Sequence, residues 1–198
     1  MKLRNKNLKI LKSNHVYSEE MEHDACGVGL VASTEGLKSR KVVEYGIDAL
    51  KAVWHRGAID ADGKTGDGAG IHIEIPKDFF EEKIEVTGHK HDNSELCVGM
   101  IFLPRNDYSA QEQCRTIVES ELTKRNFSIY GWRQVPVDPS VLGEKAEQTR
   151  PEITQVLFTY NDKKVVNKSL EQKLYETRRV IEKAALNNQL NNLIFFKY

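Results

Sequence analysis

The chain has 198 residues, a length that fits one domain with a single core or part of a larger protein. Its 29 basic and 29 acidic side chains cancel, which argues against a nucleic-acid-binding surface and against a polybasic membrane surface. The cysteines Cys26, Cys97 and Cys114 lie far apart without a C-x-x-C pair, which argues against a disulfide framework or zinc ribbon and favours a reducing, cytoplasmic compartment.

Residues 1–25 are predicted to form a short propeptide that ends at Ala25. They are basic near the start but lack the apolar stretch of a secretion signal, and acidic residues precede Ala25. No segment of the chain reaches the ~18 apolar residues of a membrane span. A disordered tail is the alternative interpretation of residues 1–25.

The next segment predicts a strand followed by a helix. Residues 27–33 have the composition of a short buried strand. After Ser39, apolar residues recur at helical spacing, and Gly57 is placed to end the helix. The apolar positions are Val43, Ile47, Leu50 and Trp54.

A loop rich in glycine and aspartate covers residues 57–70, and we refer to it as the Gly-Asp loop. After it, isoleucines at positions 71, 73 and 75 alternate with polar residues up to Pro76. This period of two predicts a strand with one buried face.

The remaining sequence predicts a mixed α+β domain. Residues 96–103, 127–135 and 154–160 have the composition of strands. Ser109 and Glu112 match a capping box for a helix that runs to about residue 125, with Cys114, Ile117 or Val118, and Leu122 on its core face. A last helix carries Leu170, Leu174, Ile181 and Ala184 or Ala185. Residues 193–196 are expected to form an exposed edge strand.

Cys26 and Gly27 are the first candidates for a chemical role. Cleavage between Ala25 and Cys26 would leave a thiol and a free α-amine on one residue, and an amine with a pKa of about 7.7–8.0 can accept the thiol proton. Gly27 lets the backbone approach a reacting group closely because it has no Cβ. Considered alone, Cys26 is more typical of a buried core thiol.

Arg56, in the motif His55-Arg56-Gly57-Ala58, is the second candidate. A guanidinium can bind the α-carboxylate of an amino acid through two parallel hydrogen bonds. Contact with the carbonyl groups at the end of the preceding helix is the alternative role for Arg56.

The third candidate is the run Thr65-Gly66-Asp67-Gly68-Ala69-Gly70. It lacks the Lys-Ser/Thr ending of a phosphate loop and leads into a predicted strand. We interpret it as a tight turn that brings backbone close to an active centre, with Asp67 as a structural hydrogen-bond acceptor. His89 and His91 are expected in a solvated loop rather than in a metal site.

Together these motifs resemble those of the class II glutamine amidotransferases, and in particular the amidotransferase domain of glutamate synthase. The resemblance covers residues 22–185. It rests on the motifs above and on a further segment, Gly131-Trp132-Arg133-Gln134-Val135-Pro136-Val137-Asp138-Pro139-Ser140-Val141-Leu142-Gly143. Other branches do not generally share that segment, so another class II amidotransferase is the less favoured alternative.

The resemblance implies a four-layer αββα sandwich of the N-terminal nucleophile hydrolase type, incomplete at the C-terminus. It implies that Cys26 is the catalytic nucleophile that hydrolyses L-glutamine to glutamate and ammonia, and that Arg56 binds the substrate. It also implies that the active-site loop residues have a structural role and that the site uses no metal. These residues are Gly27, Gly57, Asp67 and Gly68.

The resemblance also implies partners for this segment, which itself is expected to carry no cofactor. In the full-length family protein, ammonia reaches a flavin barrel that uses FMN and an iron–sulfur cluster to convert 2-oxoglutarate to glutamate. A small electron-donating subunit is a further possible partner.

We therefore expect a propeptide at residues 1–25, a partial amidotransferase domain at residues 26–186 and an aberrant or truncated tail at residues 187–198. The sequence contains no Asn-Gly pair, the family element that supplies the oxyanion hole. Losing one oxyanion donor costs about 10²- to 10³-fold in rate, so we expect little or no glutaminase activity from the chain alone. A shortened, noncatalytic relative that binds glutamine or pairs with a completing chain is the alternative.

Overall fold

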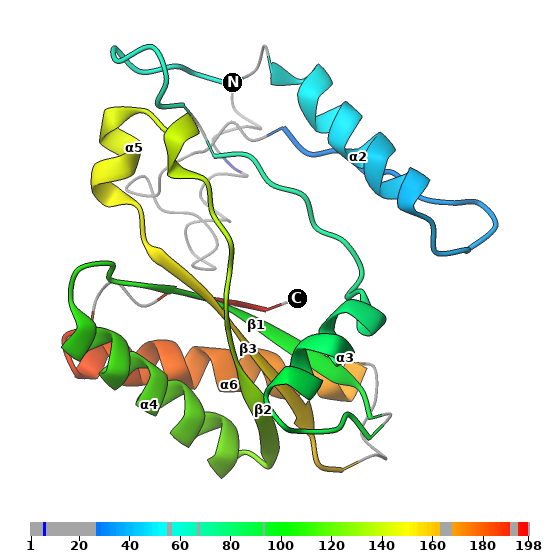
Figure 1. Ribbon diagram of the computed structural model, residues 1–198, viewed down its shortest axis with the longest axis vertical. Helices are drawn as coiled ribbons and strands as arrows, with labels where there is room; N and C mark the ends of the chain where they lie inside the picture. Colours follow the sequence, from blue (N-terminus) through cyan, green and yellow to red (C-terminus); the bar gives the residue numbers. More distant parts are fainter. Residues whose placement is uncertain are drawn as a thin grey trace. The chain divides into compact units, whose positions relative to one another are not determined.

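The computed structural model describes residue 6 and residues 27–54, 57–66, 68–92, 94–162, 168–190 and 194–197. The chain divides into two compact units, Met1–Arg56 and Gly57–Tyr198, which we describe separately. Figure 1 shows the chain as a ribbon and labels most of its helices and strands.

The first unit contains helix α2 (Arg40–Ala52), which begins where the sequence predicts. Ser39 caps the helix, because its hydroxyl accepts a hydrogen bond from the backbone N–H of Lys41 at 3.2 Å. The helix ends at Ala52 and therefore does not extend to Gly57 as predicted. Its predicted apolar face is half-buried up to Leu50.

The prediction of a buried strand at residues 27–33 is wrong. The structure assigns no strand there, and the side chains of Val28 and Leu30 are 95% and 92% exposed. An extended segment becomes a strand only when its N–H and C=O groups pair with a neighbouring strand, and an apolar composition alone does not supply that partner.

The second unit is built on one four-stranded sheet with the order β2-β3-β1-β4, in which all neighbours are antiparallel. The edge strand expected near residues 193–196 is present as β4, which pairs with β1. In chain order the elements are α3 (Lys77–Val86), β1 (Leu96–Leu103), α4 (Tyr108–Lys124), β2 (Phe127–Gln134), the 3₁₀ helix η2 (Pro139–Val141), α5 (Glu144–Thr149), β3 (Glu152–Tyr160), α6 (Lys168–Asn187) and β4 (Ile194–Lys197).

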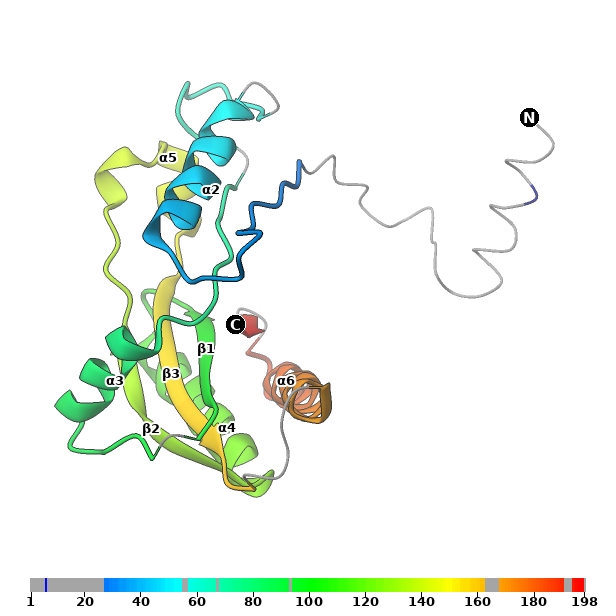
Figure 2. The same ribbon diagram turned by 90° about the vertical axis from the view of Figure 1, so that its right-hand side faces the viewer.

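The sheet buries apolar side chains on both faces. Alternate residues of β1 point to opposite sides, so Cys97 and Ile101 join a core cluster with α4 and α6, whereas Leu96 and Val98 join a second cluster with α3. Figure 2 accordingly shows α3 and α6 on opposite sides of the sheet.

The core faces predicted for the two long helices are confirmed. Helix α4 buries Cys114, Val118 and Leu122. Helix α6 buries Leu170, Leu174, Ile181 and Ala185. Within the described part of the chain, no helix is both long enough and apolar enough to cross a bilayer.

Two local predictions in this unit are wrong. Asp107, not Ser109, caps α4, and its carboxylate accepts a hydrogen bond from the backbone N–H of Ala110 at 2.9 Å. The strand predicted at residues 71–75 is not formed, and Ile71 and Ile73 are exposed. Alternation indicates one face suited to burial, but the described residues include no strand that pairs with this segment.

Candidate functional site

The structure describes half of the residues predicted for the site. Cys26, Arg56 and Asp67 lie outside the described residues. Gly27 lies in the first unit, in an exposed segment without regular secondary structure. Gly57 and Gly68 lie in the second unit, where both are exposed and belong to the Gly-Asp loop, the best described part of the predicted site.

The Gly-Asp loop forms a short hairpin-like turn. Ile59 and Gly66 form an isolated antiparallel bridge at its base. Inside this bridge, the N–H of Asp60 donates to the carbonyl of Thr65 at 2.7 Å, and the N–H of Gly63 donates to the carbonyl of Asp60 at 2.9 Å. Gly63 has a φ of 70°, a left-handed conformation that glycine adopts without steric cost.

The carboxylate of Asp62 orders the tip of this turn. Its Oδ1 accepts hydrogen bonds from the backbone N–H of Lys64 at 3.0 Å and of Thr65 at 2.7 Å, and its Oδ2 accepts one from the Thr65 hydroxyl. The hydroxyl bond, followed by the two N–H bonds, holds the pKa of Asp62 well below its usual value of 3.8. Asp62 is therefore ionised at neutral pH.

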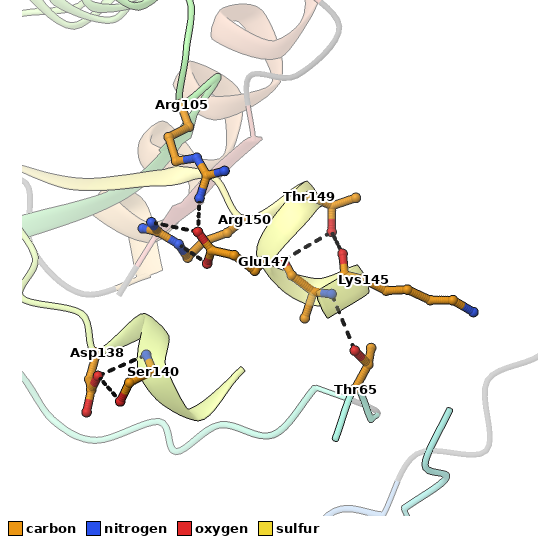
Figure 3. Close-up of polar contacts among 9 residues, drawn as sticks. Thr65, Arg105, Asp138, Ser140, Lys145, Glu147, Thr149 and Arg150 are labelled. Atoms are coloured by element: carbon orange, nitrogen blue, oxygen red, sulfur yellow. Dashed lines mark hydrogen bonds and ion pairs between the residues drawn. The ribbon is translucent and has the colours of Figure 1, made fainter. Parts of the chain in front are cut away.

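Helix α5 contacts the Gly-Asp loop (Figure 3). The Nζ atom of Lys145 lies 2.8 Å from Oδ1 and 2.7 Å from Oδ2 of Asp60. The N–H of Ala146 donates to the hydroxyl oxygen of Thr65 at 3.4 Å. Gly143 approaches the loop so closely that a Cβ at this position would overlap Oγ1 and N of Thr65.

The other side of α5 is attached to the end of β1. Glu147 accepts hydrogen bonds from Arg105, which follows β1, and from Arg150, whose Nε lies 2.8 Å from Glu147 Oε2. The Arg150 hydrogen bond, followed by that of Arg105, lowers the pKa of Glu147. Figure 3 shows this carboxylate between the two guanidinium groups.

Neither α5 nor its contacts with the loop were predicted from the sequence. A six-residue helix without buried residues has no apolar periodicity to detect. A signal was nevertheless present, since Glu144 and Glu147 lie in the first turn, where acidic residues favour a helix start. Just before α5, Asp138 caps η2 by accepting a hydrogen bond from the N–H of Ser140 at 3.0 Å.

The two cysteines that the structure describes belong to the hydrophobic core. Cys97 is 3% exposed and Cys114 is 0% exposed. Burial raises the pKa of the Cys114 thiol, with a smaller contribution from the charge of Asp107. Neither residue has the accessible sulfur that a nucleophile needs.

The side chain of His91 does not lie in a solvated loop, as the sequence suggested. It is 5% exposed, and its Nδ1 lies 3.0 Å from Oε1 of Glu81. Its ring also packs edge-on against Tyr130, with 5.8 Å between the centroids. Across the residues that the structure describes, no three or more His, Cys, Asp or Glu side chains are grouped as a metal site would require.

The chain is similar to known glutamate synthases. It is 52% identical over 186 residues to the glutamate synthase [NADPH] large chain of Azospirillum brasilense, and the alignment covers 94% of this chain and 12% of that protein. It is 35% identical over 190 residues to ferredoxin-dependent glutamate synthase 2 of Arabidopsis thaliana, again covering 94% of this chain and 12% of the relative. Glutamate synthase [NADH] of Saccharomyces cerevisiae is 37% identical over 155 residues, which cover 75% of this chain and 7% of that protein.

This chain thus spans only a small part of the length of these relatives. Residues 26–197 match the family described as glutamine amidotransferases class-II. The match includes the Gly-Asp loop and α5, and it agrees with the resemblance found in the sequence motifs. The chain therefore belongs to the class-II glutamine amidotransferases, an enzyme family, and its relatives include glutamate synthases.

Proposed function

We propose that this chain supplies the glutamine-hydrolysing site of a glutamate synthase. After removal of residues 1–25, the α-amine of Cys26 accepts the proton of its thiol. The thiolate attacks the carboxamide carbon of L-glutamine, a thioester forms, and the C–N bond breaks as ammonia leaves with the proton. Water then hydrolyses the thioester, which releases glutamate and regenerates the thiol.

Arg56 binds the substrate in this proposal. Its guanidinium holds the α-carboxylate of glutamine through two hydrogen bonds, so that attack by the Cys26 sulfur becomes effectively intramolecular. Gly27, Gly57 and Gly68 let backbone lie close to the substrate, and Asp67 accepts a structural hydrogen bond.

The distribution of the cysteines carries the proposal. The family match begins at residue 26, and the other two thiols, Cys97 and Cys114, are enclosed in the core. A glutaminase that uses a thiol nucleophile therefore has one candidate residue in this chain, which is Cys26.

We also propose the four-layer αββα sandwich of N-terminal nucleophile hydrolases as the complete fold. The support for this fold is the sheet of the second unit, against which α4 and α6 pack in one core cluster as a layer of helices on a layer of strands. The second sheet and its helices remain part of the proposal.

The synthase reaction itself belongs to the remainder of such an enzyme. That remainder would bind FMN and an iron–sulfur cluster, which would carry electrons from an external donor for the reductive amination of 2-oxoglutarate by the ammonia. Iron–sulfur clusters are held by several Cys thiolates, whereas this chain has three separated cysteines, two of which are buried. We therefore assign no iron–sulfur cluster to this chain, and in this proposal FMN belongs to the flavin barrel of the remainder. We expect the chain alone to have little glutaminase activity.

A chimera tests the proposal. Residues 1–197 replace the corresponding segment of the Azospirillum brasilense large chain, and glutamine hydrolysis is measured together with intact mass and N-terminal sequence. We expect an active enzyme that begins at Cys26, is inactivated by Cys26→Ala and stays active with Cys97→Ala. An active enzyme that retains Met1, or one that still hydrolyses glutamine after Cys26→Ala, would contradict the proposal.

A further inference from the structure

Polar contacts connect the hydrophobic core to α5. They start at Gln111 of α4, which is buried and whose Nε2 donates to the carbonyl groups of Pro104 at 2.9 Å and of Arg105 at 3.2 Å. These bonds fix the backbone of the turn that carries Arg105. The guanidinium of Arg105 then donates to Glu147 on α5.

Helix α5 is short but internally supported. Its Glu147 is held by Arg105 and by Arg150, so the helix is attached at its middle and just beyond its end. The hydroxyl of Thr149 donates to the carbonyl groups of Lys145 at 3.3 Å and of Ala146 at 3.4 Å (Figure 3). The helix thus presents its first turn in a defined orientation.

That first turn contacts the Gly-Asp loop at two separate points. Lys145 binds both carboxylate oxygens of Asp60, near the base of the loop. Gly143 lies against Thr65, whose hydroxyl is already engaged with Asp62. Asp60 lies on the arm that enters the turn and Thr65 on the arm that leads into Gly66, and the N–H of Asp60 joins the two arms by donating to the carbonyl of Thr65 at 2.7 Å.

We propose that α5 is a positioning element for glutamine hydrolysis and that Lys145 is its main positioning residue. By holding Asp60, Lys145 keeps the backbone of residues 60–66 in its hairpin conformation. This inference rests on the proposed function, because it gives the Gly-Asp loop the role assigned there. The loop is held from the core through Gln111, Arg105, Glu147 and Lys145.

Hydrogen exchange of the 198-residue chain tests the structural part directly. In Lys145→Ala, we expect amide exchange within residues 57–66 to become about five-fold faster. This is the size of effect expected when the loss of an exposed ion pair shifts a local opening equilibrium. Lys145→Arg should restore slow exchange. Lys124→Ala is the matched control, because Lys124 is 63% exposed and paired with Glu121, and Lys145 is 62% exposed.

Steady-state kinetics of the chimera test the functional part. We expect Lys145→Ala to lower kcat for glutamine about five-fold while KM changes less than two-fold, because Arg56 and not the loop binds the substrate carboxylate. Lys145→Arg should recover the rate, and Lys124→Ala should leave it unchanged. A change in KM alone, or an unchanged kcat, would overturn the positioning role.

The two measurements separate failure of this inference from failure of the proposed function. If the unsubstituted chimera does not hydrolyse glutamine, the proposed function fails, and with it the catalytic role of α5. If the chimera is active and Lys145→Ala leaves either loop exchange or kcat unchanged, the inference about α5 fails and the proposed function stands.

Discussion

Lys145 and Asp60 form an ion pair between residues that are 85 positions apart in the chain, with both carboxylate oxygens within 2.8 Å of the ammonium nitrogen. Both side chains are partly exposed, so the pair contributes only about 0–1 kcal/mol to global stability. Its effect is local, because it joins the first turn of α5 to the base of the Gly-Asp loop. The loop conformation therefore depends on a segment far away in sequence.

Gly143→Ala is expected to destabilise the second unit. The added Cβ would overlap Oγ1 and N of Thr65, so the loop or α5 must shift. The φ of Gly143 is −76°, which alanine adopts readily, and the cost therefore comes from the contact. We expect the free energy of unfolding, measured by urea denaturation, to fall by about 1–3 kcal/mol.

Gly70→Ala is the matched control for this experiment. A Cβ on Gly70 meets no atom within 4 Å, and Gly70 is not among the glycines with positive φ. We expect a change within about 0.5 kcal/mol. Equal stability of the Gly143→Ala and Gly70→Ala variants would show that α5 does not lie against Thr65.

Acid should loosen the tip of the Gly-Asp loop through Asp62. The folded-state pKa of Asp62 lies below its usual value of 3.8, so its contribution to the folded loop is complete above pH 3.8 and is lost as the pH falls through the folded-state pKa. The titration of the Asp62 carboxyl carbon, followed by NMR, should have its midpoint below 3.8.

Two substitutions at Thr65 test whether its hydroxyl causes the low pKa of Asp62. Thr65→Val removes the hydroxyl that is its largest cause, and the midpoint should move up towards 3.8. Thr65→Ser retains the hydroxyl and should keep the midpoint low. Identical midpoints for the two variants would contradict the hydrogen bond between Thr65 and Asp62.

The parts of the fold that the sequence predicted well are those with a local, repeating cause. Cys114, Val118 and Leu122 recur at helical spacing, so the core face of α4 could be identified from the sequence. The position of the helix start was less certain, because Asp107 and Ser109 both suit an N-cap, and local pattern does not decide between them.

The parts that failed depend on distant residues. Ile71 and Ile73 alternate as in a strand, but alternation cannot show whether a partner strand is present. The contact between Asp60 and Lys145 depends on how α5 packs. Because α5 has six residues and no apolar face, its packing could not be predicted from the sequence. For the site, the motifs around Cys26 and Arg56, the Gly-Asp loop and residues 131–143 together identified the family. The contacts that support the loop became visible only in three dimensions.

Gly131→Ala is expected to destabilise the edge of the sheet next to α3. Strand β2 has a register irregularity between Ile129 and Gly131, and Gly131 has a φ of 155°. A Cβ there would lie 2.8 Å from Cγ2 of Thr87. We expect a loss of about 1–3 kcal/mol in the free energy of unfolding, measured by urea denaturation.

A double-variant cycle with Thr87→Ser tests this contact. Serine lacks Cγ2 but keeps the hydroxyl, which donates to the carbonyl groups of Ile84 at 2.7 Å and Tyr130 at 2.9 Å. Gly131→Ala should therefore cost at least about 0.5 kcal/mol less in the Thr87→Ser background. Additive effects of the two substitutions would mean that strain at Gly131, and not the contact, explains the loss.

Arg56→Lys is expected to weaken glutamine binding in the chimera. Lysine keeps the positive charge but lacks the planar guanidinium that binds both carboxylate oxygens. We therefore expect the binding free energy of glutamine to weaken by about 1.5–3 kcal/mol. This corresponds to a KM for glutamine that is at least about ten-fold higher, with kcat little changed, because the carboxylate is held equally in the ground state and the transition state. Arg40→Lys on α2 is the matched control, since Arg40 is exposed and paired with Glu44, and its KM should equal that of the unsubstituted enzyme. An unchanged KM in Arg56→Lys would exclude Arg56 from binding the substrate carboxylate and would favour its alternative role at the carbonyl groups of the helix end.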